Sequence, residues 1–412
     1  MSLIIQKFGG SSVADIERIQ NVARIVSKAR QEGHAVVAVV SAMYGETDRL
    51  IKLAQTISDS NLREYDALIS TGEQISAALL SMVLQERNCP ARSYTAAQIR
   101  LHTTNEHKKA RIVDIDLEIL CHDLQVGCVP VVAGFQGISE MGEITTLGRG
   151  GSDLTAVALA AALQADECQI FTDVDGVYTS DPKVVPRARC IPQITFDEMM
   201  EMSSLGAKVL QNRCLEFAGK YKVPVRVLSS LRKGPGTLIT FEHNSAEQPL
   251  VSGIAFERRQ AKLTIQGIPE RPGLVSYILG PLSKADIEVD MIVQNEPTID
   301  TKIDFSFTLQ RDDYYKSFLI MKQVASELNA REVLGSDSLA KISLIGVGMR
   351  SHAGIASQMF SALGKEGIHI HLITATEIKI SALIDEKFID LGARTLHSAF
   401  RLDQPYFFIK GY

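Results

Sequence analysis

Cysteine is scarce in this sequence and tryptophan is absent. The six cysteines are scattered through 412 residues and form no C-x-x-C pair. A disulfide framework is implausible in a chain of this size, and no cysteine spacing supports a zinc site. We therefore expect reduced thiols and a cytoplasmic location.

An excess of charge of one sign is also missing. The 43 Lys and Arg residues stand against 48 Asp and Glu residues, which gives a formal net charge of −5. Such a surface does not attract nucleic acid or anionic lipid as a whole. We expect neither partner, and any phosphate group that the protein binds must be held by a local site.

Long hydrophobic runs are lacking as well. No charged segment followed by a long apolar stretch begins the sequence, so we expect no secretory signal. The most apolar helical stretch, residues 154–163, is about half as long as a membrane-spanning helix, which favours a buried core helix. Hydrophobic residues still make up 45% of the chain, enough for sizeable cores in two or three domains.

The first half of the chain alternates short β-branched runs with helical patterns. Between the first two runs, Ile16, Ile19, Ala23 and Val26 share one helix face, and the pattern ends at Gly33. This rhythm predicts an α/β fold with a mostly parallel sheet flanked by helices, in one catalytic domain over residues 1–245. Five runs are predicted to be buried strands: residues 3–7, 35–40, 130–133, 169–172 and 224–228.

The second half contains an internal repeat. Residues 265–295 and 344–374 each show a strand, a loop ending in glycine, an amphipathic helix and a second strand, followed by a further strand and helix. The order β-α-β-β-α-β is that of a ferredoxin-like unit. We expect a linker strand and the first unit over 246–338, and the second unit over 339–412. The run 251–256 could complete either sheet.

Two glycine-rich loops each lead from a strand into a helix. In the first, Gly9 and Gly10 let backbone N–H groups approach an anion, and Lys7 adds a cation. The second places Arg149 where a guanidinium suits a carboxylate or phosphate, although Ser152 could simply cap the helix. The sequence has no Walker A motif and no protein-kinase H-R-D or D-F-G set, which excludes those two phosphotransferase classes.

Three further motifs are ambiguous on their own. Acidic residues in the segment 172–178 are spaced closely, but the later ligands of a calcium loop are missing. A turn at Asp175 explains them simply, whereas a nucleotide site would use the carboxylates on ribose hydroxyls and Tyr178 beside a base. Glu73 suits the first turn of any helix, and Lys208 resembles an ordinary surface lysine.

Together these motifs resemble the aspartate kinases that carry a C-terminal pair of ACT domains. The resemblance covers essentially the whole chain and implies an amino-acid-kinase-like sheet followed by two ferredoxin-like ACT units. In the first half it rests on KFGGSSVAD (7–15), VVSAMYGETDRL (39–50), STGEQIS (70–76), TTLGRGGSD (145–153), TDVDGVYTSDPK (172–183) and SLGAKVLQ (204–211). In the second half it rests on ERPG (270–273), DMIVQN (290–295), VGMRSHAG (347–354) and EIKIS (377–381).

The resemblance also implies roles for individual residues, with Lys7, Lys208 and Asp153 as the catalytic ones. It implies an ATP site made of Lys7, Phe8, Gly9, Gly10, Ser11, Ser41, Thr172, Asp173, Tyr178, Asp181, Lys183 and Lys208. It implies an aspartate site made of Thr47, Glu73, Arg149, Gly150, Gly151 and Ser152. The cofactors are then ATP and Mg²⁺, the metal being carried by ATP and not held by a site of the protein's own.

The chemistry that follows is phosphorylation of the aspartate side chain to 4-phospho-L-aspartate, the first step of lysine, threonine and methionine biosynthesis. The acceptor carboxylate has an ordinary pKa of about 3.9 and is already ionised, so no general base is needed. In-line positioning and charge neutralisation are needed instead. Two alternatives remain at this point: a kinase for glutamate or acetylglutamate, and an amino-acid sensor that has lost turnover.

Control is expected in the second half. The resemblance to ACT units implies that lysine, threonine or both are the inhibitors, bound at these units. The free edges of ferredoxin-like sheets also predict a homo-oligomer, either of this chain alone or together with a shorter chain begun internally. The residues expected at the effector sites are Glu270, Arg271, Pro272, Gly273, Leu274, Val275, Gln294, Asn295, Ser351, His352, Gly354 and Ile355.

Overall fold

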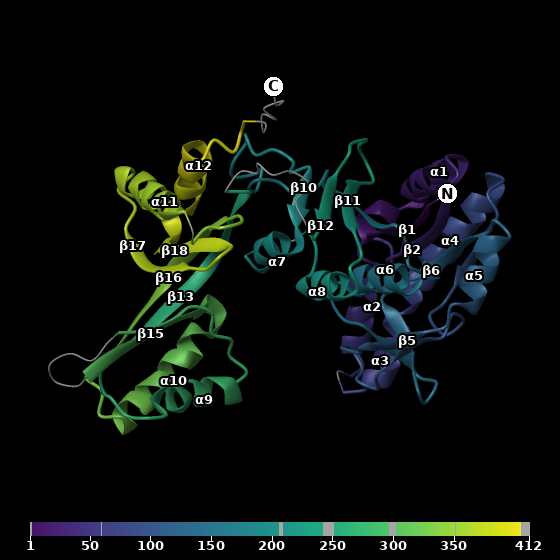
Figure 1. Ribbon diagram of the computed structural model, residues 1–412. Helices are drawn as coiled ribbons and strands as arrows, with labels where there is room; N and C mark the ends of the chain where they lie inside the picture. The colour runs from purple at the N-terminus through teal and green to yellow at the C-terminus, as the bar shows by residue number, and fades with distance from the viewer. Residues whose placement is uncertain are drawn as a thin grey trace. The chain divides into compact units, whose positions relative to one another are not determined.

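The computed structural model describes residues 2–58, 60–205, 209–241, 251–295, 302–350 and 352–404. The chain forms two compact units (Figure 1). Unit 1 contains residues 1–178 and 190–248, and unit 2 contains residues 179–189 and 249–412. The sequence assigned 1–245 to one domain, so the segment 179–189 is where the observed division differs from that prediction.

Unit 1 is built on an eight-stranded sheet in the order β10-β12-β11-β9-β1-β2-β6-β3. All neighbouring strands are parallel except β11 and β12. The strands are β1 (Leu3–Phe8), β2 (Ala35–Val40), β3 (Ala91–Tyr94), β6 (Val129–Ala133), β9 (Glu167–Thr172), β10 (Gln193–Thr195), β11 (Val225–Ser229) and β12 (Thr237–Thr240). The five predicted strands are confirmed, as is the mostly parallel sheet.

Helices cover this sheet because its central strands are apolar on both faces. Val36, Ala38 and Val40 pack with the helices α1 (Ile16–Gln31) and α4 (Thr71–Glu86) in one core. The alternate residues Val37 and Val39 are also fully buried. The helix α6 (Gly151–Ala162) packs on β1, β2 and β9. In α1 the predicted apolar face is correct except at its start, where Ile16 is half exposed.

Unit 1 also contains a smaller sheet of four strands. Its order is β5-β4-β7-β8, and the helix α3 packs against β8. These elements are α3 (Leu62–Ile69), β4 (Leu101–Thr103), β5 (Ile112–Ile115), β7 (Gln136–Ser139) and β8 (Ile144–Thr146). The remaining helices of the unit are α2 (Glu46–Gln55), α5 (Glu118–Gln125), α7 (Phe196–Ser204) and α8 (Asn212–Tyr221), with a 3₁₀ turn η1 (Gly10–Val13).

The helices α3 and α4 form an almost continuous segment, Leu62–Glu86, that is long and apolar enough to cross a membrane by length and composition. Half of that stretch is buried inside the structure. It also carries Asp66, which is fully buried, and Glu73, which is 3% exposed. The segment is therefore a core element of unit 1, in which buried carboxylates require specific partners.

Unit 2 contains a six-stranded sheet in the order β14-β15-β13-β16-β18-β17. Its strands are β13 (Gly253–Pro269), β14 (Ile292–Gln294), β15 (Lys302–Gln310), β16 (Glu332–Ile345), β17 (Ile370–Ala375) and β18 (Lys379–Asp385). Its helices are α9 (Leu274–Lys284), α10 (Tyr314–Glu327), α11 (Ala353–Lys365) and α12 (Ile389–Ala399), with short turns η2 (Arg311–Asp313) and η3 (Glu386–Phe388). Figure 1 shows α9 and α10 on one half of the long strands and α11 and α12 on the other.

The two long strands β13 and β16 are shared by both ferredoxin-like halves. The end of β13 packs with α9 and α10 in one core, whereas its beginning packs with α11 and α12 in a second core. Residues 253–257 pair antiparallel with residues 341–345. The strand whose sheet the sequence did not decide therefore completes the second ferredoxin-like half. The first ferredoxin-like half is consequently inserted into the second. Both halves contain the predicted run of strand, helix, strand, strand and helix, but the sixth strand of the second half is residues 253–257, which precede this run instead of following it.

The segment 179–189 belongs to the second ferredoxin-like half. Thr179 accepts a hydrogen bond from the backbone N–H of Ile254 at 2.7 Å, and its side chain contacts His397 Nε2 at 3.0 Å. Val185 is buried in the same core as Ile254, and Arg189 donates to the carbonyl of Leu402. These are long-range contacts that no local sequence pattern predicts.

Candidate active site

The carboxyl ends of the parallel strands in unit 1 bring the predicted loops together. Gly9 donates its N–H to the carbonyl of Phe171 at 3.1 Å, and Ser41 donates to the carbonyl of Phe8 at 3.0 Å. Phe8 and Phe171 stack beneath these loops with ring centroids 4.8 Å apart. A side chain at Gly10 would approach the carbonyl of Ala42 to 3.0 Å. Glycine at this position therefore lets the loops after β1 and β2 meet.

Lys7 and Asp153 form the charged centre of this edge. Lys7 Nζ lies 2.5 Å from Asp153 Oδ1, and about 10% of each side chain is exposed. Lys7 is the penultimate residue of β1, and Asp153 stands in the first turn of α6. Lys7 Nζ is also 3.5 Å from the point where a Cβ on Gly9 would stand. A cation is thus placed directly beside the glycine turn, as a bound phosphate requires.

Glu73 is a buried acid at the start of α4. Its Oε1 accepts a hydrogen bond of 3.0 Å from the N–H of Ala42, in the loop after β2. Its Oε2 has no hydrogen-bond partner among the described residues. Burial raises the pKa of Glu73 to about 8, and the hydrogen bond from Ala42 offsets part of that rise. An unpaired buried carboxylate of this kind is suited to a cation supplied by a ligand.

The second glycine-rich loop, residues 147–150 (the arginine loop), leads directly into α6. Gly150 precedes this helix with a φ of 72°, and a side chain there would come within 2.5 Å of Gln211. Gly151 and Ser152 are buried, whereas the Arg149 side chain is exposed and forms no ion pair with a described residue. Its guanidinium therefore remains available to a ligand. Thr47, the second residue of α2, lies half buried next to Glu46, which would be 3.6 Å from a Cβ on Gly72.

The other predicted nucleotide residues are divided between the units. Thr172 ends β9, and its hydroxyl donates a 3.0 Å hydrogen bond to the carboxylate of the next residue, Asp173. Tyr178 donates to Asp175 at 3.3 Å. Burial raises the pKa of the phenol, and the neighbouring carboxylate of Asp175 raises it further. Asp181 and Lys183 are exposed and lie in the segment 179–189, which belongs to unit 2, whereas the other predicted nucleotide residues belong to unit 1. Lys208 lies outside the described residues.

Sequence reasoning missed three residues of this region. Phe135, just after β6, has a φ of 72°, a conformation that costs a non-glycine residue energy and often marks a functional site. Gly134 approaches Ser152 so closely that a Cβ would stand 2.8 Å from its side chain. Asp66 is fully buried in α3. The glycine after β6 was a usable signal, but neither of the other two follows a local pattern.

The predicted effector loops of unit 2 are exposed at their tips. Residues 270–273, Val275, Gln294 and Asn295 are exposed, while Leu274 is buried at the start of α9. His352 contacts the carbonyl of Gly348 at 2.9 Å, and Gly354 is exposed next to the buried Ile355. Ser351 lies outside the described residues.

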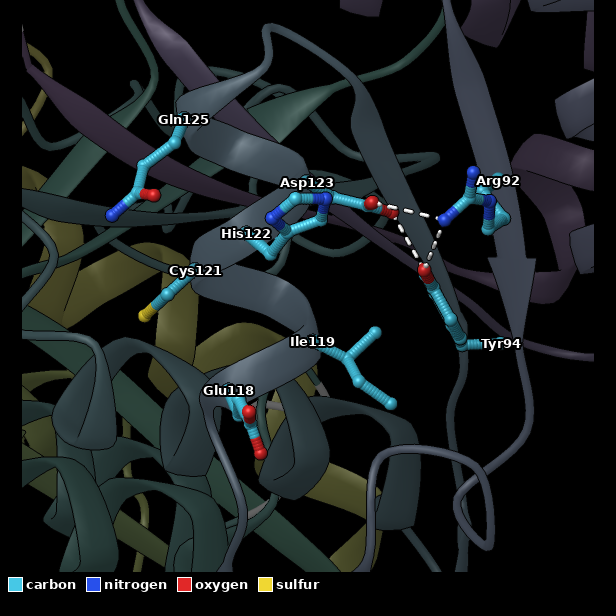
Figure 2. A pocket seen from close by; sticks show the side chains of 8 residues that line it. All are labelled: Arg92, Tyr94, Glu118, Ile119, Cys121, His122, Asp123 and Gln125. Atoms are coloured by element: carbon cyan, nitrogen blue, oxygen red, sulfur yellow. Dashed lines mark hydrogen bonds and ion pairs between the residues drawn. The ribbon is translucent and has the colours of Figure 1, made fainter.

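A surface hollow of about 740 Å³ lies away from all of these residues, between α5 and β3. Figure 2 shows Arg92 and Tyr94 on the strand facing Asp123 on the helix. Asp123 is 1% exposed and accepts hydrogen bonds from Tyr94 at 2.6 Å and Arg92 at 3.1 Å. Its carboxylate is satisfied by these partners, and none of the predicted site residues lines the hollow.

Comparison with known proteins identifies the class first. The model of the amino acid kinase family matches residues 2–229, and an ACT domain model matches residues 342–400. The structure of E. coli aspartokinase III in complex with aspartate and ADP is 28% identical. It has a TM-score of 0.76 and covers 96% of this chain and 99% of that one. The fold class predicted from the sequence is therefore confirmed.

Curated relatives narrow the class. An aspartate kinase from Stutzerimonas stutzeri is 58% identical over 407 residues, which are 98% of each chain. An aspartokinase from Pseudomonas aeruginosa is 59% identical over 408 residues, covering 98% of this chain and 99% of that one. This chain belongs to the aspartate kinase family, as the resemblance predicted.

Proposed function

We propose that this enzyme transfers the γ-phosphoryl group of ATP to the side-chain carboxylate of L-aspartate, and that Glu73 and Arg149 recognise the amino-acid head group. The observation that supports this most directly is the buried Glu73 with its unpartnered Oε2. An α-ammonium group of the substrate would pair with this oxygen and relieve the cost of burying the charge. The exposed guanidinium of Arg149 suits the α-carboxylate.

The nucleotide would be held at the glycine turn after β1. Gly9 and Gly10 allow the backbone to approach the phosphates, while Lys7 stands 2.5 Å from Asp153 and beside the turn. Lys7, together with Lys208, would stabilise the negative charge that moves during phosphoryl transfer. Mg²⁺ carried by ATP would neutralise further charge on the phosphate oxygens. The proposed contacts of unit 1 to the rest of the nucleotide are Thr172, Asp173 and Tyr178. For Asp181 and Lys183, which belong to unit 2, the nucleotide role implied by the resemblance is kept as a proposal.

Substrate choice tests this proposal directly. We expect kcat/KM for L-aspartate to exceed that for L-glutamate by about 10–200-fold, since one additional methylene is worth that much in a closed site. An ADP-coupled assay gives the rates, and trapping the product with hydroxylamine shows that a carboxylate was phosphorylated. Faster turnover of glutamate would favour a related amino acid kinase. Binding of aspartate without turnover would favour a sensor.

We further propose that lysine, threonine or both inhibit the enzyme through unit 2. The exposed loop 270–275 leads into α9, whose N-terminal N–H groups can donate hydrogen bonds to an α-carboxylate. Gln294 ends the edge strand β14 with its side chain exposed. In support, E. coli aspartokinase III has been solved in complex with lysine and aspartate, in a structure with a TM-score of 0.76. The corresponding proposed residues of the second half are Ser351, His352, Gly354 and Ile355.

Replacing Gln294 by alanine should relieve this inhibition. An effector that slows the enzyme 100-fold requires about 2.7 kcal/mol of coupling between its site and the active site. Loss of one neutral hydrogen bond removes about 0.5–1.5 kcal/mol of effector binding, so the half-inhibitory concentration should rise by roughly 2- to 12-fold. Turnover without effector should stay within about twofold.

Gln323 provides the matched control for this variant. It is an exposed glutamine of the same unit, on α10, where it donates to Glu327 at 3.1 Å. We expect Gln323→Ala to leave the half-inhibitory concentration unchanged. Equal inhibition of the wild type and Gln294→Ala would remove Gln294 from the effector site. Failure of lysine and threonine, singly or together, to slow the wild type would overturn the regulatory proposal.

The last proposals are the cellular location of the enzyme, its assembly state and the fate of its product. We propose a cytoplasmic homo-oligomer, built either of this chain alone or together with a shorter chain from an internal start. The edge strand β14 leaves backbone groups available for pairing. The product is an acyl phosphate, so a separate enzyme must consume it on the route to lysine, threonine and methionine.

A further inference from the structure

Asp66 is the most completely bonded carboxylate near the active site. It is fully buried in α3, seven residues before Glu73. Its Oδ2 accepts hydrogen bonds from the N–H of Thr146 at 2.9 Å and the N–H of Lys108 at 3.0 Å. The same oxygen contacts His107 Nδ1 at 3.0 Å, and Oδ1 accepts from the Thr146 hydroxyl at 2.8 Å. Such a charge is tolerated in a core only because all of these donors converge on it.

The partners of Asp66 connect it to the arginine loop. Thr146 is the last residue of β8, only three positions before Arg149. Lys108 touches the same loop, because a Cβ on Gly148 would lie 2.8 Å from its carbonyl oxygen. The carboxylate of Asp66 therefore fixes the point from which the arginine loop begins.

Asp66 is also linked by hydrogen bonds to the start of α4, the helix that carries Glu73. The backbone of Asp66 accepts a hydrogen bond from Ser70, which directly precedes α4. The carbonyl of Ser70 in turn accepts a 2.9 Å hydrogen bond from the side chain of Gln136. Gln136 pairs in register with Thr146 across β7 and β8. The start of α4 and the end of β8 are thus joined through two buried polar side chains.

We infer that Asp66 is a positioning residue that sets the separation between Glu73 and Arg149, and so the fit of the amino-acid head group. The inference rests on the proposed roles of those two residues. Asp66 itself would not touch the substrate, because it is fully buried and both of its carboxylate oxygens already accept hydrogen bonds from protein groups. The contacts of Asp66 reach β8 and Lys108 and do not involve the glycine turn after β1, so the effect should be selective for the amino acid.

The test compares kinetic constants for the two substrates in a small set of variants. Asp66→Ala should raise KM for aspartate about 10-fold or more, with KM for ATP within about twofold and kcat within about threefold, as expected when uniform substrate binding is lost. Asp66→Asn should recover most of the wild-type value, because its amide oxygen can replace Oδ2 and its NH₂ can donate to the Thr146 hydroxyl. Thr146→Val, which removes only that hydroxyl, should give a smaller shift in the same direction and serves if Asp66→Ala does not fold.

Asp123 is the matched control (Figure 2). It is a buried acid of the same unit that also joins a helix to a strand by hydrogen bonds, at the edge strand β3 of the large sheet. Asp123→Ala should lower the melting temperature comparably while leaving KM for aspartate within about twofold. A selective rise in Asp123→Ala, or parallel changes in both Michaelis constants in Asp66→Ala and Thr146→Val, would overturn the inference. An unchanged aspartate KM in Glu73→Gln would instead overturn the assignment of the head-group site.

Discussion

Replacing Lys7 by alanine should lower kcat by about 100-fold or more. Lys7 is the cation that lies beside the Gly9-Gly10 turn, 2.5 Å from Asp153. Removing one preorganised group that stabilises transition-state charge typically costs about 100- to 1,000-fold in kcat. The attacking carboxylate needs no activation, so charge stabilisation is the main task left to the protein. Steady-state rates with saturating ATP and aspartate measure the effect.

A loss of folding must be separated from this loss of chemistry. Lys7→Ala leaves Asp153 buried without its partner, which by itself is destabilising. Arg226→Ala is the matched control, since it breaks the partly buried pair between Arg226 and Glu167 on β11 and β9 of the same sheet. Glu167 begins β9, so this pair lies at the opposite end of the strand from the site. Thermal melting should show both variants folded, with kcat of Arg226→Ala within about threefold of wild type; unchanged kcat in Lys7→Ala would remove Lys7 from catalysis.

The difference between Lys7 and Asp66 shows what can be predicted from a sequence of this kind. Lys7 stands inside a local pattern, because the strand, the glycine turn and the helix are continuous in the chain. Asp66 gains its importance from Thr146, which is 80 residues away. Nothing in the spacing of α3 distinguishes a buried acid with four donors from a solvated one. The fold class and the loops were therefore predictable, whereas the network that aligns them was not.

In unit 2, too, the sequence predicted the local elements but not which strands pair. The repeat predicted the order of its elements correctly, since that order depends on local periodicity. The pairing of residues 253–257 depends on β16, almost 90 residues later in the chain, and on bulges in the long strand that serves both ferredoxin-like halves of the one sheet. The strain at Phe135 is equally invisible in the sequence, because phenylalanine shows no preference for a positive φ.

Glu73→Gln should weaken aspartate binding far more than ATP binding. Loss of a charge-assisted contact with the α-ammonium group costs about 1.5–3 kcal/mol, which raises KM for aspartate by roughly 10- to 150-fold. Glutamine can still accept the hydrogen bond from Ala42, so the loop after β2 should keep its position. KM for ATP should stay within about twofold; a parallel rise in both constants would indicate general disruption of the site.

The same substitution should change how stability and affinity depend on pH. Burial raises the pKa of Glu73 to about 8 in the folded protein, against about 4.3 in the unfolded chain. Between these values the folded state binds more protons than the unfolded state. The free energy of unfolding therefore falls as the pH rises, by up to about 1.4 kcal/mol per pH unit. Glutamine does not titrate, so Glu73→Gln should melt at an increasingly higher temperature than wild type between pH 5 and pH 8.

Affinity for aspartate should show the opposite trend in the wild type. The α-ammonium group binds the ionised form of Glu73, so the proton must leave when the substrate enters. KM for aspartate should consequently decrease as the pH rises from about 6 to 8, by up to about 10-fold per unit, and should be nearly independent of pH in Glu73→Gln. Measuring both variants across this range separates a substrate-binding acid from a structural one. A structural Glu73 would change the melting curves and leave the two KM profiles parallel, because only an ammonium group placed against Oε2 couples the proton to the substrate.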